Sequence, residues 1–357
     1  MEPSTPKGLA MAAMTAVYGH FDELSPGEAD AWVPPSSPGA GGHRGRYLWT
    51  DAFGVVNFVT MAVGTSSEKY MTLAKRLVWA VHDVLGRTRD GTARLDRATD
   101  QEPLKGGLRI GKTTESGPDC DGQYHHYLTL WMFALNRLSV AAKDPAYNDL
   151  AIQLARAIHP HFFVEHAPGQ MHMVWKISTD MKTVLVQSQG NLDAATGFII
   201  FKLLQDTAEK QGRGKGLLEK EVDDYAKVMG RKEETHPSGD PLDLGMGLWV
   251  SHIYPDEAWS SEFKGRALAL AGRLISKDSP TLNRPVARRL AFREFGACLG
   301  ISCCDAMSPE LQAKVEAVLD FWENHVARGF EEELRPISQV MYAAARNPGA
   351  FRMSYLT

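Results

Sequence analysis

The densest group of side chains able to do acid–base chemistry lies in the segment Asp119-Cys-Asp121-Gly-Gln-Tyr-His-His-Tyr127. It combines two carboxylates, two imidazoles and two phenols around one expected helix start. A carboxylate near a helix start and an aromatic wall can be tuned as a general acid or base. An N-cap aspartate with aromatic core packing is the purely structural interpretation of the same residues. We predict Asp121 as the catalytic proton donor, with Tyr124 and His125 binding the substrate.

Acidic residues recur along the chain, each shortly before a small or aromatic residue. The five positions are Asp51, Asp121, Asp193, Asp243 and Glu294. Taken singly, an acid near a helix N-terminus has a structural explanation, because it interacts favourably with the helix macrodipole. In a helical barrel, however, equivalent helix ends point at one mouth, so five such acids are expected to converge. One of the four besides Asp121 is then predicted to be the opposing catalytic carboxylate.

Aromatic and basic residues stand beside several of these acids. The predicted substrate-binding residues outside the segment 119–127 are Tyr47, Trp49, Trp175, Lys176, Trp249 and His252. Aromatic faces combined with carboxylates and cations suit a polyhydroxylated or oxidised ligand, and they suit an extended unsaturated ligand equally well. The residues therefore predict a small-molecule pocket without identifying its substrate.

Three further motifs are not assigned any chemistry. His159-Pro-His161-Phe-Phe-Val-Glu165-His166 has the H-x-H-x3-E spacing of cupin metal sites, but those ligands lie on strands and this segment ends an amphipathic helix. Cys298, Cys303 and Cys304 have no histidine nearby at ligand spacing. Lys105-Gly-Gly-Leu-Arg-Ile-Gly-Lys112 lacks both the Walker pattern and a preceding Rossmann strand. We therefore predict neither a metal nor a cofactor.

Two kinds of helical segment alternate from end to end and must position these residues. Amphipathic segments with an i, i+3, i+4 apolar stripe are expected at about 8–18, 66–85, 145–158, 216–228, 261–275 and 309–327. Segments that are apolar around most of their circumference begin near 50–63, 121–138, 191–204, 242–254, 289–301 and 336–345. Helices of the second kind are usually buried on most sides. The alternation predicts an all-α fold, a single (α/α)6 barrel domain over 1–357 whose six helical hairpins form an inner and an outer ring.

Three segments interrupt the helical pattern. Alternating apolar residues within 162–189 predict a small β-hairpin near the barrel mouth. The Pro/Gly-rich stretch 31–46 is expected to form a loop or flap, and 87–119 is a long polar loop. Both loops precede buried helices, where binding loops are expected.

Composition limits the classes of partner. Of the 357 residues, 44% are apolar and 23% are charged, and the formal net charge is -4. Without a basic excess, nucleic acid and anionic membrane surfaces are poor partners. No apolar run reaches the roughly 18 residues of a membrane span, the N-terminal segment lacks the pattern of a secretory signal, and 4 cysteines do not make a disulfide scaffold. We expect a cytoplasmic protein acting on a small molecule, of unassigned oligomeric state.

The helix alternation, together with Trp49-Thr-Asp51-Ala-Phe-Gly54, Asp121-Gly-Gln-Tyr-His-His-Tyr127 and Arg293-Glu-Phe-Gly296, resembles the six-hairpin glycosidase-like superfamily over nearly the whole chain. That superfamily includes (α/α)6 glycoside hydrolases, unsaturated glucuronyl hydrolases and the N-acylglucosamine 2-epimerase branch. The resemblance implies a site at the barrel mouth, with paired Asp/Glu or His residues as acid and base. The chain lacks clear equivalents of the epimerases' full set of catalytic histidines, which argues against sugar epimerisation.

A second, thinner resemblance is to class II terpene cyclases, α-barrel enzymes whose D-x-D-D motif protonates an alkene or epoxide. Asp119-Cys-Asp121-Gly122 matches the first three positions. The leading hypothesis is a cofactor-independent, glycoside hydrolase-like enzyme that uses general acid–base catalysis in the barrel mouth on a sugar or glycosylated small molecule. One alternative is an isomerase or cyclase of an unsaturated terpenoid or polyketide metabolite in biosynthesis. The other is a non-catalytic small-molecule-binding barrel, in which the inner-helix acids would all lie in caps or salt bridges.

Overall fold

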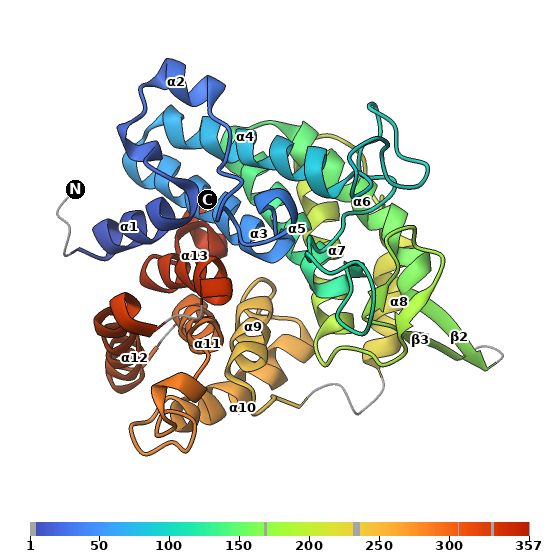
Figure 1. The fold of residues 1–357 in the computed structure, drawn as a ribbon. Coiled ribbons are helices and arrows are strands. Elements are labelled where there is room, and N and C mark those ends of the chain that lie inside the picture. Colours follow the sequence, from blue (N-terminus) through green and yellow to red (C-terminus); the bar gives the residue numbers. More distant parts are fainter. Residues whose placement is uncertain (1–4, 168–169, 231–235, 306, 330–331, 357) are drawn as a thin grey trace. The chain divides into compact units, whose positions relative to one another are not determined.

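The computed structural model describes residues 5–167, 170–230, 236–305, 307–329 and 332–356. Within these ranges the chain forms thirteen α-helices and five short strands (Figure 1). It divides into two compact units: an N-terminal unit over 20–232, and a C-terminal unit that joins 1–19 to 233–355. The expectation of one domain over 1–357 stays a prediction. Among the described helices, none combines the length and apolar character needed to span a bilayer.

Three helical hairpins build the N-terminal unit (Figure 1). Their first helices are α3 (Leu48–Thr65), α5 (His125–Ala142) and α7 (Asp193–Lys210), and their second helices are α4 (Glu68–Leu85), α6 (Pro145–Phe162) and α8 (Glu219–Met229). Each second helix packs on the first helix of its own hairpin, and α5 also packs against both α3 and α7. The three apolar helices are therefore direct neighbours, as an inner row requires. A short helix that the sequence patterns did not predict, α2 (Pro26–Ala31), packs on α4.

The C-terminal unit repeats this arrangement. It pairs α9 (Pro241–Ser251) with α10 (Ala258–Leu274), α11 (Ala291–Cys303) with α12 (Pro309–Gly329), and α13 (Arg335–Arg346) with α1 (Pro6–Tyr18). Helix α11 packs against both α9 and α13, so the apolar helices again form a row. The N-terminal helix thus supplies the amphipathic partner of the last helix.

Glycines permit the closest helix contact of the C-terminal unit. A Cβ atom on Gly245 of α9 would overlap the carbonyl group of Gly296 on α11, and a Cβ atom on Gly300 would overlap the carbonyl group of Gly245. The two backbones touch at these positions, and any side chain there would force the helices apart. This contact explains Gly245 and Gly300, whereas Gly247 makes room for the ring of Phe263.

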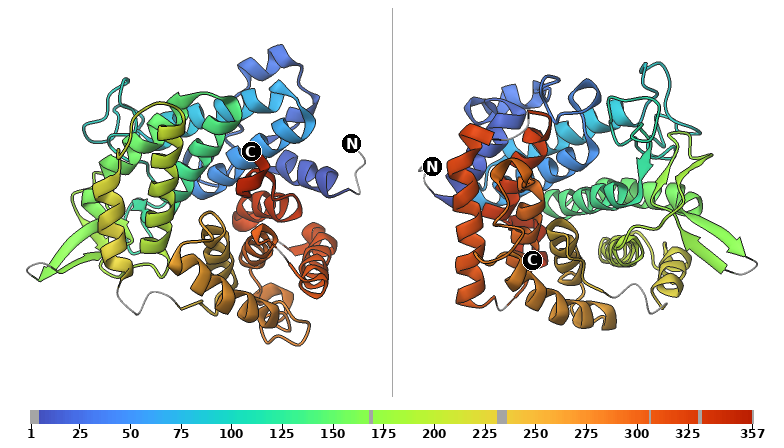
Figure 2. Two further views of the ribbon diagram at one scale, coloured as in Figure 1. Left: turned by 180° about the vertical axis from the view of Figure 1, so that it is seen from behind. Right: turned by 60° about the horizontal axis from the view of Figure 1, so that its bottom comes forward.

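Two small sheets lie in the N-terminal unit. Strands β2 (Phe163–Ala167) and β3 (Gln170–Met173) form an antiparallel pair directly after α6, and this ribbon extends away from the helices of its unit (Figure 2). The second sheet has the order β1-β4-β5, from β1 (Gln123–Tyr124), β4 (Lys176–Ile177) and β5 (Val184–Val186). The β-structure expected within 162–189 is therefore present, and it is divided between two sheets. The second sheet fixes this segment to the start of α5.

The helices expected from both apolar patterns are present, with ends shifted by a few residues. Two of these helices have side-chain N-caps: Thr5 accepts a hydrogen bond from the amide of Gly8 at the start of α1, and Asp240 caps α9. Ser25 and Glu28 form a capping box at the start of the unpredicted helix α2. Helix α6 continues to Phe162, beyond the predicted end at 158. Pro160 therefore lies inside the last turn of that helix.

Candidate active site

The starts of α5 and α7 bring one carboxylate and two imidazoles together. Oδ1 of Asp193, the first residue of α7, lies 3.5 Å from Nδ1 of His125 and 4.0 Å from Nδ1 of His126. The other oxygen of Asp193 accepts a hydrogen bond from the amide of Gly190 at 3.0 Å. Glycine is required there because a Cβ atom would press against the Asp193 carboxylate. Two inner helices thus contribute to one polar cluster.

His125 and His126 have different surroundings although they are adjacent in sequence. The His125 side chain is fully buried, and its Nε2 lies 2.8 Å from the hydroxyl oxygen of Tyr225 on α8. Gly197 lies directly against the Tyr225 ring, which a Cβ atom at that position would overlap. The His126 side chain is 32% exposed. Of the two imidazoles, His126 is therefore the one that a ligand can reach.

Burial and charge set the protonation of this cluster. Burial acts to raise the pKa of Asp193, but the nearby imidazoles of His125 and His126, together with the hydrogen bond from the amide of Gly190, outweigh it, so the pKa is lowered. Burial lowers the pKa of His126 to about 4, although the charge of Asp193 opposes the change. Burial also raises the pKa of Tyr225 well above its usual value. At neutral pH this arrangement gives an ionised Asp193 beside a neutral His126, which can accept a proton.

A set of aromatic rings surrounds His126, and we call it the aromatic platform. Its members are Tyr47, Trp49, Tyr124, His126, Tyr127 and Trp175. The rings of Tyr124, His126 and Trp175 are nearly parallel, with centroids 5.1–5.9 Å apart. Tyr127 is perpendicular to Tyr124 and His126. Such faces provide flat apolar surface next to polar groups, as small-molecule sites commonly do.

Local backbone pairing fixes the platform. Tyr124 on β1 pairs with Lys176 on β4, and the amide of His125 donates to the carbonyl oxygen of Trp175 at 3.1 Å. These bonds hold Trp175 against Tyr124 and His126 although 162–189 lies far along the chain. Two cations adjoin the same ring: Nζ of Lys176 and Nζ of Lys112 lie 5.2 Å and 5.7 Å from the Tyr124 centroid.

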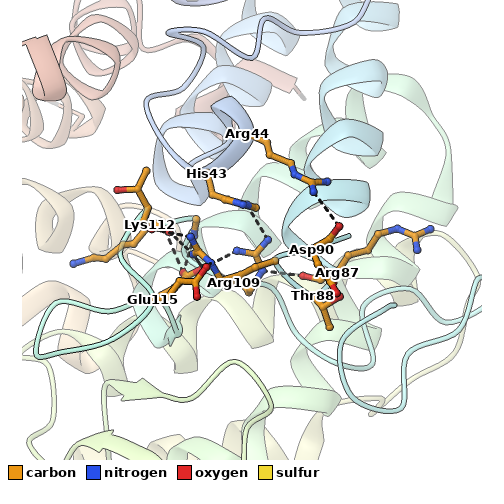
Figure 3. Close-up of polar contacts among 12 residues, drawn as sticks. His43, Arg44, Arg87, Thr88, Asp90, Arg109, Lys112 and Glu115 are labelled. Atoms are coloured by element: carbon orange, nitrogen blue, oxygen red, sulfur yellow. Dashed lines mark hydrogen bonds and ion pairs between the residues drawn. The ribbon is translucent and has the colours of Figure 1, made fainter. Parts of the chain in front are cut away.

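Asp121 is buried within a ring of hydrogen-bond donors. Its Oδ2 accepts from Arg109 at 2.6 Å and from Arg89 at 3.1 Å, and its Oδ1 accepts from the amides of Gly111, Lys112 and Gly122 at 3.0–3.2 Å. Figure 3 shows Arg109 extending toward His43, and Arg44 toward Asp90, in the same network. These contacts tie the loop 87–119 to the start of α5. These are the contacts of a structural ion pair. Both carboxylate oxygens of Asp121 already accept hydrogen bonds, whereas a residue that donates a proton to a ligand needs an oxygen that the ligand can reach.

Two other predicted acids are bound in the same way. Oδ1 of Asp51, on α3, accepts from Arg46 at 2.8 Å with both side chains buried. Glu294, on α11, accepts from Arg289 at 2.5 and 2.8 Å and from the indole N–H of Trp322 at 2.8 Å. Both carboxylates therefore have buried basic partners.

The remaining predicted residues lie in the C-terminal unit. Asp243 is half-buried in the first turn of α9, Trp249 is buried on the same helix, and His252 follows its end. Nε2 of His252 accepts from the amide of Met353 at 3.3 Å. The structure thus brings together Tyr47, Trp49, Tyr124, His125, Trp175 and Asp193 in the N-terminal unit, with Lys176 at their edge. The catalytic assignments of all five acids stay predictions.

Sequence reasoning gave no role to three residues of this region. His126 was part of the quoted motif, but nothing in the motif indicates which imidazole is accessible. Tyr225 lies on an amphipathic outer helix, where an aromatic residue predicts only core packing. Arg109 lies in an irregular loop, and the one available signal was a basic residue close in sequence to a conspicuous acid.

The sequence matches no family model and no curated protein. Its structure matches a family 76 glycoside hydrolase from a bovine Bacteroides thetaiotaomicron strain, with a TM-score of 0.59 and 13% identity, covering 96% of this chain and 76% of that one. It matches the cellobiose 2-epimerase from Spirochaeta thermophila DSM 6192 with a TM-score of 0.53 and 11% identity, covering 85% of this chain and 86% of that one. A third match is an inactive variant of an α-1,6-mannanase from Salegentibacter sp. HEL1_6, with a TM-score of 0.59, 10% identity, and coverage of 96% and 98%.

The chain therefore has the fold of (α/α)6 barrel proteins of the six-hairpin glycosidase-like superfamily, as its sequence pattern predicted. Hydrolases and sugar epimerases both occur among the structures that share it.

Proposed function

We propose that this chain is a carbohydrate-acting enzyme in which His126, supported by Asp193 and His125, transfers a proton while the aromatic platform binds the sugar. One observation carries the proposal: a partly exposed imidazole contacts a buried carboxylate and also belongs to a set of stacked rings. The Asp193 carboxylate favours the imidazolium that forms when His126 accepts a proton, and it thereby offsets part of the lowering of the His126 pKa by burial. The rings offer apolar faces to a sugar and leave its hydroxyl groups to polar neighbours.

The geometry favours an isomerase-type reaction over glycoside hydrolysis. Hydrolysis by the common mechanisms uses two carboxyl groups, one on each side of the scissile bond. Asp51, Asp121 and Glu294 are each bound by arginine, so none of them is well placed to serve as the acid. Abstraction of a proton next to a carbonyl carbon needs a single base together with a group that returns the proton, and His126 can begin such a reaction. The sequence argued against epimerisation because it lacks clear equivalents of the epimerases' full set of catalytic histidines, but the adjacent pair His125-His126 supplies two imidazoles at one carboxylate.

Similar proteins support a sugar as the substrate class. The matched Salegentibacter mannanase variant is in complex with an α-1,6-mannotetrose, and two other matched structures are a sugar epimerase and a cellobiose 2-epimerase. We therefore propose a reducing sugar or short oligosaccharide as the substrate of this chain.

A second candidate is a sugar-binding protein without catalysis. The observation that favours it is the neutralisation of Asp51, Asp121 and Glu294 by buried arginines, because acids held in ion pairs are what a barrel without acid–base chemistry would retain. The cluster of His126 and Asp193 is what distinguishes the two candidates.

Incubation of the protein with reducing sugars in D2O separates these functions. The panel contains mannose, glucose, cellobiose and α-1,6-mannotetraose, each analysed by mass spectrometry and by NMR. Deuterium at the carbon next to the carbonyl, with formation of an isomer, is the result we expect. Shortened oligosaccharides without deuterium would indicate hydrolysis. Saturable binding in calorimetry, with neither deuterium nor shortened products, would favour the binding protein and refute the enzyme.

A further inference from the structure

Cys120 differs from the other cysteines of the chain in its surroundings. Cys298, Cys303 and Cys304 are buried, and burial raises the pKa of the Cys304 thiol to about 11 and those of the other two further. Cys120 is only half-buried and follows the exposed stretch 113–119. A thiol that solvent oxidants can reach, in a chain whose other thiols are enclosed, is the preferred site of oxidation.

A buried lysine lies beside this thiol. Nζ of Lys176 donates a hydrogen bond to the carbonyl oxygen of Cys120 at 2.6 Å and lies 3.9 Å from its Sγ. The Lys176 side chain is 1% exposed, and within the described part of the chain no carboxylate forms an ion pair with it. The backbone of Lys176 is fixed by the pairing of β4 with β1. An amine is thus held at near-contact distance from an accessible sulfur.

We propose that Cys120 and Lys176 form a redox modification site, in which peroxide oxidises the thiol and the lysine amine then bonds to the oxidised sulfur. The proposal rests on the placement of the two side chains and is independent of the proposed sugar chemistry. It assigns a use to a half-buried thiol and a buried amine that the proton-transfer cluster does not employ.

The chemistry proceeds in two balanced steps. In the first, the Cys120 sulfur attacks hydrogen peroxide, the O–O bond breaks, and a sulfenic acid and one water molecule form, so that sulfur loses two electrons and the peroxide gains them. In the second, the Lys176 amine, after releasing its extra proton to solvent, attacks the sulfur. An S–N bond forms, the S–O bond breaks, and a second water molecule leaves. Reduction by an added dithiol returns the thiol and the amine.

The bond would connect two parts of the candidate active site. Cys120 precedes the ion-paired Asp121, and Lys176 follows Trp175 of the aromatic platform. Nζ of Lys176 also lies over the Tyr124 ring. Covalent attachment to sulfur would hold this amine on the Cys120 side and fix the stretch 113–121 to β4. Oxidation would therefore alter the edge of the platform.

Mass spectrometry of the peroxide-treated full-length protein tests the proposal. We expect a cross-linked peptide pair containing Cys120 and Lys176 that is lighter than the sum of its parts by two hydrogen atoms and disappears on reduction. It should form in the folded protein, be greatly diminished in urea, and be absent from Cys120→Ser. Lys176→Arg, which keeps the charge without a condensable amine, should stop at the sulfenic acid, trapped with dimedone.

Several results would overturn the proposal. In the wild-type protein, failure of peroxide to oxidise Cys120 would do so, as would accumulation of the sulfenic acid without a cross-link to Lys176. A cross-linked peptide pair whose mass shows that the oxygen atom is retained would also do so. Equal linkage in folded and urea-unfolded protein would also overturn it, because proximity would then have no part. The comparison of folded with unfolded wild type stays informative even if Lys176→Arg does not fold.

Discussion

Replacing Asp121 by asparagine separates a structural from a catalytic role for this residue. Asn keeps the shape of the side chain but removes the negative charge that lies between Arg109, which is 1% exposed, and Arg89, which is 21% exposed. Removing one partner of a buried ion pair leaves the other charge buried and uncompensated, at a cost of about 3–5 kcal/mol. Arg89 can turn toward solvent and toward Glu115, so the loss of its ion pair with Asp121 adds little to this cost. We therefore expect the free energy of unfolding to fall by about 3–5 kcal/mol.

Urea titration followed by tryptophan fluorescence measures this change as a shift of the midpoint at constant slope. The matched double variant Asp121→Asn with Arg109→Met removes both buried charges, and it should recover part of the loss because no uncompensated charge remains. The rate of deuterium incorporation into a reducing sugar, measured in protein that is still folded, should stay within about threefold of the wild-type rate, since no reacting group is removed. The opposite pattern would show that Asp121 is catalytic and not structural: stability unchanged within about 0.5 kcal/mol and turnover reduced by about 10²-fold or more.

Three further predictions concern other buried contacts. Gly197→Ala should lower the melting temperature and cost about 1–3 kcal/mol, because the added methyl group displaces the Tyr225 ring that binds His125; an unchanged melting curve would contradict this packing. Burial lowers the pKa of His82 to about 3, so between about pH 6.5 and pH 3 the unfolded chain binds a proton that the folded chain does not. The free energy of unfolding should therefore decrease as the pH is lowered through this range, by up to about 1.4 kcal/mol per pH unit. His82→Gln, which keeps an acceptor for the Trp131 indole N–H, should flatten the dependence of the urea midpoint between about pH 4 and 7, and an equal slope in both proteins would exclude His82 as its source. Glu294→Gln should destabilise the C-terminal unit by about 3 kcal/mol, because Arg289 loses its buried partner, whereas Glu310→Gln, an exposed i,i+4 pair with Lys314, should change thermal unfolding by less than about 0.5 kcal/mol.

The helical architecture could be predicted because its signals are local and repeated. An apolar stripe at i, i+3, i+4 and a fully apolar helix differ in burial whatever their partners, so residues 66–85 and 50–63 could be assigned to different layers. The short helix α2 could not be assigned in this way, because six residues contain too few positions for a periodic pattern.

The candidate site could be predicted only in part. The aromatic residues and Asp193 were recognised because unusual residue types cluster at helix starts. What the sequence could not supply was pairing: Asp121 meets Arg109 from an irregular loop, and Asp193 meets His125 from another hairpin. Those contacts depend on tertiary packing, which leaves no characteristic residue spacing in the sequence. They decide which carboxylates are neutralised by a basic partner.

Deuterium incorporation by matched variants tests whether His126 transfers the proton. The rate at which a reducing sugar gains deuterium in D2O is compared among wild type, His126→Asn and Asp121→Asn, each shown to be folded by circular dichroism. We expect His126→Asn to lose about 10²-fold or more of the rate, while folded Asp121→Asn exchanges deuterium nearly as fast as wild type. Exchange at the wild-type rate in His126→Asn would contradict this expectation.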